Sequence, residues 1–216
     1  MSTFDALDRA ITDGSDPSVV SGICRGLLAD ILAGRHRLAA VRHPLGFCCL
    51  PVVRDGDLGV CIHVWVRAAP GAELTTSTVH CHSWELLSFV LYGRVTHALF
   101  EIEDDDSGPG RVVEVISSGD LDRLRPTSRR VHCHERERRE IGAGDRFRLS
   151  GGQFHSSVVQ DGAEAATVVL SWTVGTVDLS IGPPDVVDHQ VRRQVCDPAE
   201  TAQIVRAALA GLAATG

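Results

Sequence analysis

The feature that most constrains the fold is a succession of short apolar runs, extending from Gly46 to about Ile181, separated by turn-forming residues. Glycine, proline and aspartate at such breaks favour turns, and short β-rich runs at this rhythm are typical of antiparallel sheets. We therefore predict an all-β core, arranged as a sandwich or a barrel. The predicted strands span residues 46–53, 58–66, 78–82, 87–103, 112–117, 147–150 and 166–174.

Helical patterns flank this β-rich region. Asp16-Pro17 combines an N-cap with a proline in the first turn, and apolar residues at helical spacing continue from there to Gly34, which predicts a helix. A shorter helix is predicted before it, over 4–11. Near the other end, Asp197, Pro198 and Glu200 predict a capped helix over 197–213. We expect one structural domain made of a helical prefix (1–45), a β-barrel (46–181) and a C-terminal segment (182–216), with the helices packed outside.

Composition excludes several classes of function. The formal net charge of −7 is unlike that of a nucleic-acid-binding protein, which normally carries a clustered basic face. The first residues lack the pattern of a secretory signal, and apolar runs are too short to cross a bilayer, so we expect a cytoplasmic protein without membrane contact. The 7 cysteines contain no CxxC pair and are expected to be free thiols.

Three histidines suggest a metal site. His80 and His82 are two residues apart in a predicted strand, so both side chains point to one face while Cys81 points to the other. His155 follows Gly151-Gly152-Gln153-Phe154 near another strand and is the candidate third ligand. We predict that His80, His82 and His155 bind one divalent metal ion.

A second His-Cys-His segment provides an internal control. His132 and His134 have the same spacing as His80 and His82, but they lie among alternating arginines and glutamates over 129–139. Such a sequence predicts a charged hairpin in solvent. We therefore do not expect this segment to bind the catalytic metal.

These residues resemble the two motifs of the cupin superfamily over about 46–175. His80, His82 and Gly93 take the places of the first motif, and the second motif is matched by Gly144, Ser150, Gly152 and His155. The resemblance implies a double-stranded β-helix, a jelly-roll-like barrel with a metal-binding cavity. Cupins commonly form homodimers through an edge strand, and the terminal helices here offer a surface for such pairing or cover that edge instead.

The glutamate of the first cupin motif would fall at Leu86, whereas this chain carries Glu85. A shift of one residue in a strand turns a side chain to the opposite face. We therefore favour a shell of three histidines, and Glu85 becomes a candidate general base if it reaches the cavity.

A three-histidine shell resembles the thiol dioxygenase branch of the cupins, the branch of cysteine dioxygenase. The order of features, Leu58 to Trp65, then the histidine pair, then Leu91-Tyr92-Gly93, is similar to that branch. The branch's arginine for the substrate carboxylate falls near Cys48 or Cys49, and only Ser171 remains of its serine-histidine-tyrosine relay. Cysteine itself is therefore not the expected substrate.

Three neutral imidazoles on one face of an octahedral ion leave positions for a substrate and dioxygen. Fe(II) is favoured, although zinc, nickel or manganese would fit the same ligands. We predict a mononuclear non-haem iron oxygenase acting on a small polar, chelating substrate with O2. The alternatives are an isomerase, hydrolase or lyase that uses zinc, nickel or manganese as a Lewis acid, and a non-catalytic small-molecule binding protein.

Five further residues are candidates for substrate binding. His63 and Arg67 alternate with Cys61 and Trp65 on one strand face, which lines the barrel or faces solvent. Aromatic residues near the motif serve in packing or in the pocket, and an amide beside the third histidine could orient a ligand. The candidates are His63, Arg67, Trp84, Tyr92 and Gln153.

Overall fold

The computed structural model describes residues 1–66, 76–160, 162–175 and 177–215. Strands make up 49% of the structure and helices 21%, which confirms the predicted all-β class. The helices are α1 (Thr3–Thr12), α2 (Pro17–Leu32) and α3 (Pro198–Ala214). The strands are β1 (Val41–Arg42), β2 (Cys48–Asp55), β3 (Leu58–Trp65), β4 (His80–Cys81), β5 (Trp84–Tyr92), β6 (Arg94–Asp104), β7 (Gly110–Ser118), β8 (Leu121–Gly142), β9 (Arg146–Leu149), β10 (His155–Val158), β11 (Ala165–Thr173), β12 (Asp178–Gly182), β13 (His189–Arg192) and β14 (Gln194–Val195).

The strands form two antiparallel sheets. The first has the order β14-β1-β2-β3-β11-β5-β9, and the second has the order β13-β8-β6-β10-β4-β12-β7. In the second sheet β7 also pairs with β8, so six of its strands form a closed ring. Two antiparallel sheets around a cavity, with the helices outside, agree with the jelly-roll-like double-stranded β-helix expected from the sequence.

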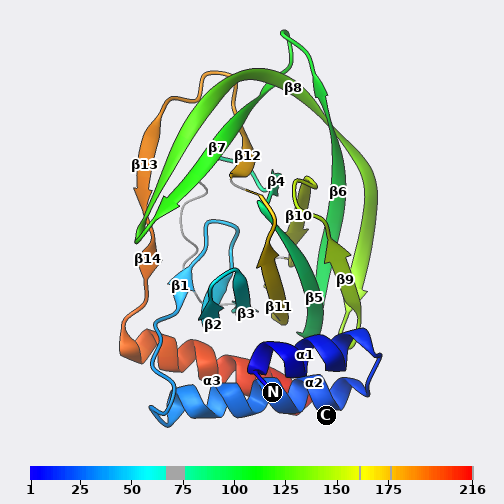
Figure 1. Ribbon diagram of the computed structural model, residues 1–216, viewed down its shortest axis with the longest axis vertical. Coiled ribbons are helices and arrows are strands. Elements are labelled where there is room, and N and C mark those ends of the chain that lie inside the picture. The colour runs from blue at the N-terminus through cyan, green and yellow to red at the C-terminus, as the bar shows by residue number, and fades with distance from the viewer. Residues whose placement is uncertain (67–75, 161, 176, 216) are drawn as a thin grey trace.

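The three helices gather on one side of the molecule, beneath β2, β3, β5 and β11 (Figure 1). Their apolar faces and the outer face of the first sheet form the largest hydrophobic core, to which α1 contributes Leu7 and α2 contributes Leu28. Along β3, Val60, Ile62 and Val64 belong to this core, whereas the alternate residues line the internal cavity. The alternation of β3 therefore separates a structural face from a cavity face.

The helix boundaries follow the predicted caps. Asp16 accepts a hydrogen bond from the backbone N–H of Ser18 at 2.8 Å and begins α2. At α3, Asp197 and Glu200 form a capping box, with reciprocal backbone-to-side-chain bonds of 2.8 and 3.0 Å. Both predicted helix starts are thus confirmed by the local chemistry that predicted them.

A glycine divides one predicted strand into two. The run predicted over 87–103 contains Gly93, whose φ of 76° is readily adopted only by glycine, and the chain turns there from β5 into β6. A Cβ at this position would lie 2.8 Å from Cα of Ala165. The turn therefore needs glycine for both conformation and space.

The largest difference from the sequence prediction is β8. The charged segment predicted as a hairpin in solvent is one strand of 22 residues, which pairs first with β7 and then with β6. Pairing along its whole length gives the backbone hydrogen-bond partners, while the charged side chains stay on the surface. Two short strands beyond residue 182, β13 and β14, were not predicted either. Within the described part of the chain, none of the helices is long and apolar enough to cross a membrane.

Candidate metal centre

Three histidines from two neighbouring strands meet at one point of the second sheet. His80 of β4 stands opposite His155 of β10 in the antiparallel register, and His82 follows immediately after β4. One ligand atom from each of the three lies within 4.8 Å of the others. Their ring centroids are 4.3 Å apart for His80 and His155, 4.7 Å for His80 and His82, and 5.1 Å for His82 and His155. We call these residues the histidine triad.

Backbone carbonyls orient two of the three rings. Nδ1 of His80 lies 2.9 Å from the carbonyl oxygen of Thr78, and Nδ1 of His155 lies 3.1 Å from that of Gln153. Each Nδ1 must carry the proton to donate these bonds, so each Nε2 keeps its lone pair. His82 is held differently, because its ring stacks on Trp84 with centroids 3.9 Å apart and planes 17° from parallel.

The environment of the triad favours uncharged imidazoles. Burial lowers the pKa of His80, and it lowers the pKa of His82 and His155 well below the ordinary value. The proximity of the other imidazoles adds to the shift for His82 and His155. Neutral imidazole is the form that binds metal ions, so protonation state, orientation and spacing all fit a divalent ion.

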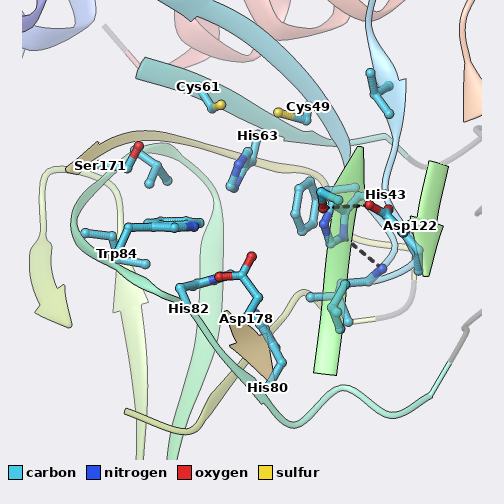
Figure 2. Close-up of a pocket in the computed structure, with 18 of the residues that line it drawn as sticks. His43, Cys49, Cys61, His63, His80, His82, Trp84, Asp122, Ser171 and Asp178 are labelled. Atoms are coloured by element: carbon cyan, nitrogen blue, oxygen red, sulfur yellow. Dashed lines mark hydrogen bonds between the residues drawn. The ribbon is translucent and has the colours of Figure 1, made fainter. Parts of the chain in front are cut away.

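Part of the interior between the sheets is a cavity of about 1010 Å³, bordered by residues from both sheets. The first sheet contributes Cys49, Cys61, His63 and Trp65, and the second contributes the triad and Asp178. Figure 2 shows His80, His82 and Asp178 together below His63, with the two cysteines beyond it. The cavity is large enough for a small polar substrate in contact with a metal ion.

The structure brings some of the predicted site residues to this cavity. His63 and Trp84 line it, and the face of β3 that carries Cys61, His63 and Trp65 is the cavity face. Arg67 lies outside the described residues.

Three other candidates do not line the cavity in the described structure. Glu85 lies between Trp84 and Leu86, which both face the cavity, so the alternation of β5 turns Glu85 away. Tyr92 is buried against α3, where a Cβ on Gly211 would clash with its ring. The side chain of Gln153 is exposed, and this residue orients His155 through its backbone carbonyl rather than its amide.

A carboxylate that sequence reasoning missed reaches the cavity from another strand. Asp178, at the start of β12, accepts a hydrogen bond of 2.6 Å from the backbone N–H of Ser83, the residue after His82. In the described part of the chain, the donor group at the triad contains histidines alone. No local pattern could have revealed Asp178, because 95 residues separate it from Ser83 and β-pairing alone brings them together.

A fourth histidine, His97, lies next to the triad. His97 of β6 is buried, its Nδ1 lies 3.1 Å from Oγ of Ser157, and its ring centroid is 5.6 Å from that of His155. The ring of Phe147 stacks on the ring of His97, with centroids 4.4 Å apart. Burial lowers the pKa of His97 to about 4, which keeps it uncharged beside the triad.

Comparisons with known proteins find matches among solved structures but not among family models or curated sequences. No protein-family model and no curated protein sequence matches the chain. Among solved structures, KdgF from Halomonas sp. matches at 18% identity and a TM-score of 0.35, covering 63% of this chain and 87% of that one. The DMSP lyase DddQ from Ruegeria pomeroyi DSS-3 matches at 15% identity and a TM-score of 0.33, covering 68% of this chain and 51% of that one. At such values neither match assigns a family or an activity to the chain.

Proposed function

We propose that the chain is a metal-dependent enzyme, a mononuclear non-haem iron oxygenase that acts on a small polar substrate. His80, His82 and His155 would hold the ion, the first and the last through Nε2, and Fe(II) is the favoured metal. The observation that carries the proposal is the convergence of three neutral imidazoles on one point of a cavity of about 1010 Å³. A bound ferrous ion would supply redox chemistry with O2 and would hold the substrate by chelation.

The residues around the triad define what the substrate should be. A shell of neutral ligands leaves the charge of a dication uncompensated, so it favours a substrate that chelates through an anionic group. Arg54 and Arg193 also line the cavity, although Arg193 is paired with Asp122 at 2.7 Å. A thiolate, an enolate or an α-hydroxy acid has the required chemistry.

The protein's own groups have separate tasks in this proposal. The carbonyls of Thr78 and Gln153 fix the rings of His80 and His155, and Trp84 fixes the ring of His82 by stacking. Asp178, one of the carboxylates that line the cavity, accepts a proton from the substrate as it becomes anionic. Its bond from the backbone N–H of Ser83 holds that carboxylate in place.

The first test is metal analysis of protein purified without added metal, followed by anaerobic loading with Fe(II) and measurement of oxygen uptake. Small thiols, α-hydroxy acids and enolisable dicarbonyl compounds form the substrate panel. We expect iron to bind once per chain and at least one compound to stimulate oxygen uptake. Full occupancy by zinc, with no oxygen uptake after iron loading, would contradict the oxygenase and favour Lewis-acid chemistry at the same ligands.

Substitution of one ligand separates an enzyme from a binding protein. We expect His82→Ala to lose metal and turnover together, because two imidazoles hold a divalent ion far less tightly than three. The matched control is His134→Ala, which removes a histidine of the same local spacing on the protein surface. A His82→Ala variant that keeps full affinity for a panel compound would instead indicate a metal-independent binding protein.

A further inference from the structure

A second group of metal-ligating side chains lies in the same cavity, on the first sheet. Cys49 of β2 and Cys61 and His63 of β3 each present a donor atom, and these three atoms lie within 4.8 Å of one another. Figure 2 shows the three residues together on the side of the cavity away from His80 and His82. Neither the histidine triad nor the proposed oxygenase chemistry uses them.

Strand pairing explains why the three donors converge. Cys49 stands opposite His63 in the β2–β3 register, while Cys61 lies two residues before His63 and therefore on the same face. Directly opposed residues of antiparallel strands have Cβ atoms about 4.5–5.5 Å apart, which suits two ligands of one ion. The arrangement is thus built into the sheet and does not depend on a mobile loop.

Neighbouring side chains hold the donors in place. The ring of His63 stacks on Phe47 at 4.2 Å, and Phe47 stacks in turn on His43 at 4.3 Å. Cys61 makes side-chain hydrogen bonds with Cys49 and His63 and receives a bond of 3.2 Å from Nη2 of Arg54. A guanidinium beside the sulfur stabilises the thiolate, which is the form that binds metal ions.

A disulfide is the main alternative use of two neighbouring thiols, but the register disfavours it. Cys61 is opposite Pro51, so Cys49 and Cys61 occupy diagonal positions of the β2–β3 pair. Diagonal neighbours lie about 7–8 Å apart, whereas disulfides join Cα atoms about 4.4–6.8 Å apart. Both cysteines are free thiols in the structure.

We propose that Cys49, Cys61 and His63 form a second metal site, selective for a soft or borderline cation such as Zn²⁺, that faces the histidine triad across the cavity. Two thiolates and one imidazole are a donor set typical of zinc, and they leave its fourth position open to the cavity. Binding would release the two thiol protons, so that two thiolates neutralise the dication. Each donor group can be loaded independently of the other, and this site does not rest on the proposed oxygenase activity.

The test uses Co²⁺ as the probe, because cobalt bound to thiolate has a near-ultraviolet charge-transfer absorption that cobalt bound to histidine alone lacks. We expect reduced, chelator-treated protein to develop this absorption with one equivalent of Co²⁺ at the thiolate site, and Zn²⁺ to abolish it by competition. Cys49→Ser with Cys61→Ser should remove it, and His63→Ala should weaken the cobalt affinity by more than the ~10–100-fold typical of losing a supporting partner.

Two controls keep the test specific. Cys48→Ala changes the neighbouring cysteine, which is packed in the helix-side core, and should leave the absorption intact. His82→Ala should also leave it intact, because that change removes a ligand of the other site. No charge-transfer absorption in the reduced protein, or equal absorption in the double serine variant, would overturn the proposal. If the histidine triad does not bind metal, the metal content of His82→Ala would equal that of the wild type, and the cobalt absorption would not be affected.

Discussion

The chain contains the tripeptide His-Cys-His twice, and the two copies occupy opposite environments. At residues 80–82 it lies beside the cavity, and the opposing His155 is 3% exposed. At residues 132–134 it lies on the surface of β8, where the side chains of His132 and His134 are 42% and 52% exposed. Both pairs of imidazoles obey the same alternation, so the local spacing cannot distinguish them.

Their partners account for the difference. Nε2 of His132 lies 3.1 Å from a carboxylate oxygen of Asp105, and Nε2 of His134 lies 3.3 Å from one of Glu103, in pairs surrounded by solvent. At the first copy, the nitrogens face a third imidazole from the adjacent strand and are shielded from water. A His-x-His pair therefore predicts a metal site only when the neighbouring strand supplies another donor in a buried place.

The largest expected effect is a difference in metal affinity between variants of the two copies. We expect His82→Ala to weaken binding of Fe(II) at the triad by more than the ~100-fold upper range for losing a supporting partner, because a direct ligand is lost. His134→Ala should leave the affinity unchanged. Isothermal titration of metal-free protein measures both variants, and equal losses would show that the comparison between the copies is wrong.

Of the two copies, only the first should stabilise the fold when Fe(II) binds. At a metal concentration 100 times the dissociation constant, binding to the folded state raises the free energy of unfolding by about 2.7 kcal/mol. We expect this gain in thermal unfolding of the wild type and of His132→Ala, and not of His155→Ala. A gain that survives in His155→Ala but disappears in His132→Ala would reverse the assignment.

A histidine outside the triad whose pKa is lowered by burial should make the free energy of unfolding depend on pH. This tests whether burial distinguishes the histidines beside the cavity from those on the surface. Burial lowers the pKa of His43 to about 3, with a further contribution from His63. In the unfolded chain this histidine binds a proton near pH 6.5, so between pH 6.5 and 3 the unfolded state holds more protons than the folded state. The contribution of His43 to the free energy of unfolding therefore falls as pH falls. The expected loss is about 1.4 kcal/mol per pH unit below 6.5.

Urea unfolding of metal-free protein between pH 7 and 5 measures this slope. His43→Phe keeps a ring to stack on Phe47 and should remove the contribution of one histidine. His132→Phe, at an exposed position, is the matched control and should leave the slope in place. Identical slopes in wild type and His43→Phe would contradict the prediction.

The smallest effect should come from the ion pairs of the second copy. Exposed ion pairs add little to stability because solvent screens them, so Glu103→Gln and Asp105→Asn should leave the free energy of unfolding nearly unchanged at pH 7. Neither change should alter metal binding. A larger loss of stability, or a loss of metal, would mean that the β8 segment has a structural or metal-binding role that its exposure does not indicate.

Several features of the fold were predictable because their causes are local. The caps at Asp16 and Asp197 define where two helices begin, and the turn residues over 104–110 mark where β6 ends. The spacing of His80 and His82 was enough to predict that both face the same side. Counting from Gly93 also predicted that Glu85 would turn away from the cavity, as its absence from the described cavity lining indicates.

Other features depend on contacts between residues distant in sequence. The local sequence predicted a hairpin within the charged run over 121–142, but the run forms one continuous strand because β7 and β6 pair with its two halves. Asp178, and the convergence of Cys49 with Cys61 and His63, likewise follow from sheet register, which no short motif records. Local patterns specify caps, turns and the face on which a side chain lies. Long-range hydrogen bonding between strands determines which faces meet, and burial excludes water from the site that they form.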